Sequence, residues 1–159
     1  MATKAILPVY PAYEFNAHVP TVRYYEGIGQ SFKQGQAVKL SGPGLMMHGT
    51  AGAKILGFAA DDATQTISSE IGVWVAMPGV IFEGNIHHTA TSAAGKIMHS
   101  DIGTLCALTN LSGITVVDKR VSGATSTTVV IVGFKDNVGD QFGRVYFTVK
   151  HGYSQFDNP

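Results

Sequence analysis

The chain has 159 residues and a mass of 16.8 kDa, a length typical of one domain with a core of its own. Its formal net charge is +0 and its pI is about 7.0, so charge recruits neither nucleic acid nor an acidic membrane, and we expect neither as a partner. Charged residues make up only 14% of the chain, against roughly 25% in ordinary soluble domains. This low content of charged residues favours a surface that is partly covered, either by further copies of the chain or by another protein.

Residues 1–30 differ in composition from the rest. They contain Pro8, Pro11 and Pro20, which disfavour a helix and favour extended backbone. Large rings lie among these prolines at irregular spacing, namely Tyr10, Tyr13, Phe15, Tyr24 and Tyr25. Two interpretations stay open: a strap that packs across its own domain, or an arm that grips a neighbouring subunit through its rings. We expect an extended N-terminal arm, followed by a single β domain over residues 31–159.

From residue 31 onward the pattern is all-β. Apolar residues come in short runs or in alternation, and Gly, Ser, Thr and Asn interrupt them about every 8 to 12 residues, as in a sandwich or barrel. No segment has convincing helical periodicity. The predicted strands are 37–40, 54–60, 72–82, 105–109, 115–118, 127–134 and 144–150. The fold class we expect is therefore a small β-barrel or β-tulip-like domain.

Three segments carry further detail. The run GVWVAMPGVIFEG, residues 72–84, is apolar on both faces, so it is central or covered by a partner, and Pro78-Gly79 predicts two shorter strands that meet at a kink. Residues 144–150 alternate polar and apolar side chains, which predicts one core face and one wet face. Before them, KDNVGDQFG has the composition of a hairpin turn.

Two long surface loops are predicted, at residues 41–50 and 87–101. The first of them, SGPGLMMHGT, places two methionines together at its tip, where they form a soft contact surface or fold back onto the core. The single tryptophan is interpreted as a core residue or an interface anchor. The candidates for a subunit interface are Trp74, Met77, Met46 and Met47.

Asp61-Asp62 follows a buried strand in the stretch ILGFAADDA and resembles a catalytic pair. Adjacent residues at a strand end point to opposite faces, so these two carboxylates cannot converge on one substrate. We interpret them as turn residues that accept hydrogen bonds from freed backbone N–H groups.

Metal-binding patterns are also incomplete. Adjacent histidines on extended backbone diverge, and no HxH, HExxH or cysteine cluster completes a ligand set around His87, His88 and His99. Asp136, Asn137 and Asp140 are residue types that bind calcium, but the spacing of an EF-hand loop is absent. We interpret this acidic segment as a turn and expect no metal.

Cys106 is the only cysteine, so it forms no disulfide within the chain, and it has no evident histidine partner. No GxSxG elbow, GxGxxG or P-loop pattern occurs. We expect no enzyme, no catalytic residue and no cofactor. No run of about 18 apolar residues and no conventional signal peptide are found, which favours a soluble protein synthesised in the cytoplasm.

Three stretches carry a resemblance to a known family: GQSFKQGQAVKLSG, ILGFAADDA and GVWVAMPGVIFEG. Together they resemble the decoration, or cement, proteins of tailed-bacteriophage capsids, over roughly residues 29–84. The later FKDNVGDQFGRVYFTVK is similar to the closing hairpin of virion surface proteins. The long N-terminal segment and the region after residue 85 depart from shorter members of the family.

The resemblance implies a β-barrel or β-tulip domain, often a homotrimer, on the outer surface of an expanded capsid in the virion. Its partners would be the major capsid protein and further copies of itself, and the protein would stabilise the capsid by clamping neighbouring subunits. Residues 1–30 then become the candidate capsid grip, through the five rings named above.

Two alternatives remain open. The first is a receptor- or carbohydrate-binding module of a virion fibre or spike, in which the polar loops 41–50 and 87–101 would bind glycans. The second is a small β-barrel hydrolase, which would need a convergent cluster of carboxylates or histidines.

Overall fold

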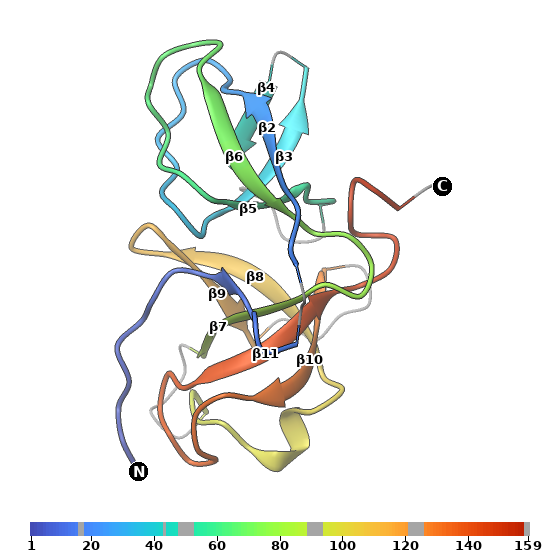
Figure 1. Cartoon of the computed structure of the whole chain (residues 1–159). Helices are drawn as coiled ribbons and strands as arrows, with labels where there is room; N and C mark the ends of the chain where they lie inside the picture. The colour runs from blue at the N-terminus through green and yellow to red at the C-terminus, as the bar shows by residue number, and fades with distance from the viewer. Residues whose placement is uncertain (16–17, 43, 48–52, 89–93, 121–125, 158–159) are drawn as a thin grey trace.

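The protein is all-β, as the sequence predicts, and its strands form two sheets (Figure 1). The computed structural model describes residues 1–15, 18–42, 44–47, 53–88, 94–120 and 126–157, with the backbone alone for Met46 and Met47. Among these residues the strands are β1 (Tyr10–Pro11), β2 (Thr21–Tyr25), β3 (Ala37–Ser41), β4 (Gly44–Met47), β5 (Gly57–Ala59), β6 (Glu70–Val75), β7 (Ile81–His87), β8 (Leu105–Leu111), β9 (Ile114–Asp118), β10 (Val129–Phe134) and β11 (Arg144–Val149). A short 3-10 helix, η1 (His99–Asp101), precedes β8. None of the helical structure in these residues is long and apolar enough to cross a membrane.

The first sheet curls until its two edges meet. Its strand order is β2-β6-β5-β3-β4, and the ends of β2 and β4 are joined by a parallel bridge between Glu26 and Leu45, with Gly27 N–H donating to the Leu45 carbonyl at 3.0 Å. Gly44 makes this approach possible, because a Cβ there would lie 2.5 Å from the Tyr25 carbonyl oxygen. We call these five strands the first ring. It encloses a small cluster of Phe32, Val38, Leu45, Leu56, Ala59, Ile71 and Val73.

The second sheet also closes on itself. Its order is β7-β11-β10-β8-β9, and β9 pairs with the end of β7 in parallel, with Ile86 opposite Val117. The other pairings around this second ring are antiparallel, and β1 adds to β7 from outside, with Tyr10 opposite Glu83. A closed ring leaves few unpaired strand edges, which protects the sheet from pairing with other chains.

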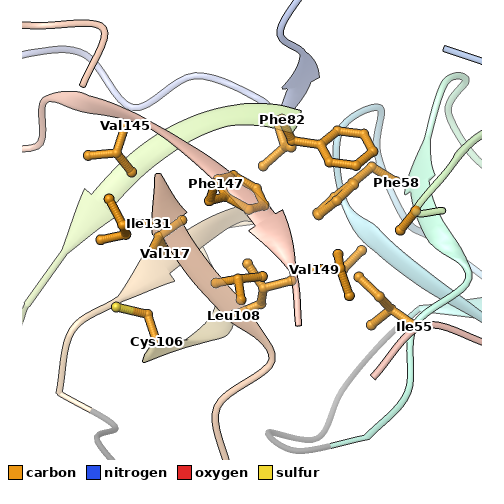
Figure 2. Packing of buried hydrophobic residues seen from close by; sticks show 14 of the residues in the cluster. Ile55, Phe58, Phe82, Cys106, Leu108, Val117, Ile131, Val145, Phe147 and Val149 are labelled. Carbon is orange, nitrogen blue, oxygen red and sulfur yellow. The ribbon is translucent and has the colours of Figure 1, made fainter. Parts of the chain in front are cut away.

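A shared hydrophobic core joins the two rings (Figure 2). Phe58 of β5 packs on Phe82 of β7 with ring centroids 4.7 Å apart, and on Phe147 of β11 at 5.8 Å. Successive residues of β5 point to opposite faces, so Phe58 lies in the shared core while Ala59 lies in the first ring's own cluster. Burial on both faces explains why the sequence ILGFAA carries no polar residue.

Polar contacts tie the rings together as well. The Ala37 N–H of β3 donates to the Thr115 hydroxyl of β9 at 2.9 Å, a buried contact from one ring to the other. After β11 the chain returns to the first ring, where Ile55 N–H donates to the Tyr153 carbonyl and Gln155 N–H donates to the Ile55 carbonyl. The fold is therefore one connected structure built from two rings.

Each predicted strand overlaps an observed one, and residues 72–82 divide at Pro78-Gly79 as predicted. The division is larger than a kink. β6 ends at Val75 in the first ring and β7 begins at Ile81 in the second, with a turn between them in which Val80 N–H donates to the Met77 carbonyl. The run is apolar on both faces because the second ring covers the outer face of β6, where Trp74 joins the shared core.

The predicted loop at residues 41–50 is wrong for its middle part. Gly44–Met47 forms β4 and pairs with β3, so Met46 and Met47 lie in a strand rather than at a loop tip. A short turn at Gly42, which has a φ of 48°, allows the two strands to meet. Residues 48–50 lie outside the described part of the chain. The predicted loop 87–101 begins at the last residue of β7 and ends in η1, and its residues 89–93 are not described.

The N-terminal segment is extended, as predicted, and it packs along its own chain. β1 pairs with β7 of the second ring and β2 pairs with β6 of the first, while Val9 and Val19 are buried in the shared core. Within the chain the strap interpretation therefore holds. The expected boundary at residue 30 does not separate an arm from a domain, because β2 completes the first ring.

We predict that Phe58→Ala lowers the free energy of unfolding by about 3–5 kcal/mol, because it leaves a cavity between the two rings. Urea unfolding followed by circular dichroism measures this change. Val132→Ala, at a side chain that is 42% exposed in the second ring, is the matched control and is expected to have a small effect. If Phe58→Ala costs no more than the control, the rings do not depend on their shared core.

Candidate functional site

Asp61 and Asp62 are turn residues, as the sequence predicts. Asp61 accepts a hydrogen bond from Gly72 N–H at 3.0 Å, and Asp62 accepts one from Gln34 N–H at 2.8 Å. The Gln34 N–H and then the Lys33 ammonium hold the pKa of Asp62 below its usual value. The two carboxylates serve separate backbone groups and do not form a pair.

Glu26 is a fully buried carboxylate that sequence reasoning missed. It accepts hydrogen bonds from Thr64 N–H at 2.8 Å, from the Thr64 hydroxyl at 2.7 Å and from Gln65 N–H at 2.8 Å. Its backbone forms the bridge to Leu45 that closes the first ring. A charged group buried this deeply needs such donors, and here they hold the 64–66 turn against the ring closure.

Cys106 is buried in β8 and unsuited to nucleophilic chemistry. Burial, together with the nearby Asp101 carboxylate, raises the pKa of its thiol to about 12. The thiolate that a cysteine nucleophile requires is therefore scarce at neutral pH.

The histidines that the structure describes do not assemble a metal site. Among the described residues, no group of three or more His, Cys, Asp or Glu side chains is placed to hold a metal ion. His87 is buried and stacks on Phe142 with ring centroids 5.9 Å apart, while His99 meets the edge of Phe134 at 6.4 Å. Burial is the main reason that the pKa of His87 lies below its ordinary value; Arg120 and His88 lower it further, and Asp118 opposes them.

The acidic turn at residues 136–140 anchors the N-terminal segment. Asp140 accepts a hydrogen bond from Ala2 N–H at 2.8 Å, and the Lys4 ammonium lies 3.3 Å from Asp140 and 3.8 Å from Asp136. Asp136 also accepts from Arg144 N–H at 2.8 Å. The predicted turn is confirmed, and its carboxylates serve backbone groups and ion pairs of this chain.

The five aromatic side chains of the predicted arm do not form one surface. Tyr10 is half-buried and packs on Trp74 with centroids 5.7 Å apart. Tyr13 and Phe15 are 64% and 58% exposed beside the second ring. Tyr24 and Tyr25 lie on β2 in the first ring, where Tyr24 is half-buried and Tyr25 is 60% exposed.

The exposed pair Tyr13 and Phe15, which we call the aromatic patch, is held in place by its surroundings. The Phe15 ring meets the edge of Tyr146 of β11, with centroids 4.7 Å apart and ring planes at 74°. Between the two patch residues, Glu14 lies 3.8 Å from the Lys135 ammonium. Lys135 also pairs with Glu83 on β7, so charged side chains border the aromatic centre.

The four interface candidates also separate. Trp74 is only 9% exposed and belongs to the shared core, the first of its two predicted roles. Met77 is 42% exposed in the turn between the rings. The side chains of Met46 and Met47 lie outside the described residues.

A groove opens on the first ring where β2 runs beside the β3–β4 turn. It has a volume of about 380 Å³. Tyr25 and Glu70 face each other across the β2–β6 pairing at one side, and Leu40 and Gly42 line the other. The sequence did not indicate this groove, because only the register of the strands brings these residues together.

A scan against protein-family models, a search of curated proteins and a search of solved structures each found no match for this chain. Its function is therefore inferred from its own residues and their arrangement.

We predict that Glu26→Ala destabilises the protein by about 1–3 kcal/mol, because it leaves the N–H groups of Thr64 and Gln65 without their buried acceptor. Chemical unfolding measures the change. Glu70→Ala is the control, since Glu70 is an exposed glutamate on the same ring, and it should alter stability by less than about 0.5 kcal/mol. Equal effects of the two substitutions would contradict the role assigned to Glu26.

His87 is predicted to make stability fall with acid. Its pKa is lower in the folded chain than in the unfolded one, so as the pH drops below about 6.5 the unfolded chain takes up the proton first and is stabilised relative to the folded chain. His87→Phe keeps a ring against Phe142 and removes this titration. The free energy of unfolding should decrease less between about pH 7.5 and pH 5.5 for the variant than for the parent. An identical fall in both proteins would contradict the assignment.

Proposed function

We propose that the protein is a structural virion protein that binds the outer surface of a mature tailed-phage capsid and stabilises it by clamping neighbouring subunits of the major capsid protein. The observation that carries this proposal is the aromatic patch of Tyr13 and Phe15, whose side chains are 64% and 58% exposed beside the second ring. The resemblance of residues 29–84 to capsid decoration proteins supports the same assignment.

The patch has the anatomy of a protein-binding surface. Exposed aromatic residues at the centre of a contact and charged residues around it are typical of interfaces whose energy is concentrated in a few side chains. Here the rings of Tyr13 and Phe15 form the centre, and Glu14, Lys135 and Glu83 border it. A capsid subunit with a matching apolar pocket would cover the two aromatic side chains and leave Glu14 and Lys135 near solvent.

The patch is fixed before any partner binds. Ala12 is buried and β1 pairs with β7, so the backbone on one side of the patch is already ordered. Phe15 N–H donates to the Ala12 carbonyl at 3.0 Å, and this hydrogen bond fixes the turn that carries the side chains of Tyr13 and Phe15. A surface that is ordered in advance loses little conformational entropy on binding, so more of its contact energy contributes to affinity.

The proposed mechanism is linkage between binding and capsid state. A protein that binds only the expanded shell stabilises that shell by its binding free energy, and it adds nothing to the shells it does not bind. Copies assembled as a homotrimer would contact several capsid subunits at once, which multiplies the effect of a weak single contact. The carboxylates described above are hydrogen-bonded or ion-paired within the chain, and the thiol is buried. These surroundings favour a binding role over a catalytic one.

The double substitution Tyr13→Ala with Phe15→Ala is expected to leave the fold intact and to weaken capsid binding by at least about 30-fold, since each exposed ring would act as a hot spot worth about 1–2 kcal/mol. Binding is measured by co-sedimentation with capsids of the native source that have been stripped of this protein. Tyr25→Ala removes an aromatic side chain of similar exposure from β2, in the first ring, and is the matched control. Saturation of capsids by the double variant at the parent's concentration would contradict the proposal.

A further inference from the structure

The groove on the first ring exists because the two edges of the sheet meet at one bridge only. Beyond the contact of Glu26 with Leu45, no strand of the described residues lies on the outer side of β2, which runs past Gly42 instead. The space between them measures about 380 Å³, near the lower end of the range for sites that bind small ligands.

Two oppositely charged side chains in this groove are left without internal partners. The side chains of Arg23 and Glu70 make no hydrogen bond or ion pair with the described residues, although both residues line the groove. Six other cations of the chain are engaged in ion pairs, namely Lys4, Lys33, Lys119, Arg120, Lys135 and Arg144. The guanidinium and the carboxylate of the groove are therefore available to a ligand.

Two tyrosines supply the apolar surface of the groove. Tyr25 presents a ring that is 60% exposed, and Tyr24 packs partly against the cluster inside the first ring. Burial raises the pKa of Tyr24, so its phenol stays protonated and can both donate and accept a hydrogen bond. Both tyrosines lie on β2, which pairs with β6, so their backbone positions are fixed.

The chemistry of these groups selects the ligand class. An anionic ligand would meet the carboxylate of Glu70, and a cationic one would meet the guanidinium of Arg23. A neutral ligand rich in hydroxyl groups satisfies both, because a hydroxyl accepts from the guanidinium and donates to the carboxylate. The apolar C–H face of a sugar ring would cover the exposed ring of Tyr25. We propose that this groove binds a neutral saccharide.

The site differs from the one assigned to capsid binding. The aromatic patch lies beside β11 of the second ring, whereas the groove is built from β2, β6 and the β3–β4 turn of the first (Figure 1). It overlaps the predicted glycan-binding loop 41–50 at Gly42 and Gly44, whereas its charged and aromatic side chains come from β2 and β6. The inference does not depend on the proposed capsid function.

The test is a titration of the ¹⁵N-labelled full chain, followed by amide chemical shifts, with three neutral probes: maltotriose, cellotriose and tri-N-acetylchitotriose. At least one probe is expected to shift the amides of Arg23, Tyr25 and Gly42 with a Kd of about 1 mM or lower. Tyr25→Ala and Glu70→Gln should each weaken that binding by at least about 5-fold, as expected for the loss of about 1 kcal/mol. Tyr13→Ala, on the second ring, should bind as the parent does.

Two results would overturn the proposal. One is the absence of shifts at the groove with every probe up to about 20 mM, a concentration that nearly saturates a site with a Kd near 1 mM. The other is parental affinity in both Tyr25→Ala and Glu70→Gln. The double variant at Tyr13 and Phe15 separates the two functions, because it should lose capsid binding and keep saccharide binding.

Discussion

The contact of Phe58 with Phe82 and Phe147 is the interaction on which the rest of the structure depends, because it joins two rings that are small on their own. The first ring encloses a cluster of seven buried residues, whereas the shared cluster has eighteen and draws on both rings. Small units bury too little surface to be stable alone. The shared core, shown in Figure 2, therefore makes the two rings one unit. It also fixes the patch beside the second ring relative to the groove on the first.

A fixed N-terminal segment follows from the same design. An arm that is free in solution must be ordered when it binds, and that ordering subtracts from affinity. Here Lys4 pairs with Asp140 and Glu14 with Lys135, so the segment is attached to the second ring at both ends of β1. The aromatic side chains of this segment therefore have fixed positions before a partner binds. The low overall charge of the chain agrees with this arrangement, since most of its charged side chains are committed to internal pairs and turns.

The sequence predicted the strands whose signal is local and missed those that depend on distant partners. β5 is apolar on both faces, and the structure buries both. β11 alternates, but its predicted wet face is wrong, because Phe15 packs on Tyr146 and no residue of the strand is exposed. β2 has only exposed and half-buried side chains, so it carries no periodic pattern, and it forms because β6 and the bridge at Glu26 hold it. The same reason hid the groove: Tyr25 and Glu70 become neighbours only through strand register. The N-terminal segment is dense in aromatic side chains, but nothing local in the sequence could divide them between core, patch and groove.

The measurement that tests the central claim most directly is the copy number of this chain in particles from its native source. Large particles would be sedimented through sucrose, and the chain would be quantified against the most abundant capsid polypeptide. The account predicts a fixed ratio near one copy per capsid subunit in particles that already contain DNA. A few tens of copies per particle, or absence from every particle, would contradict it.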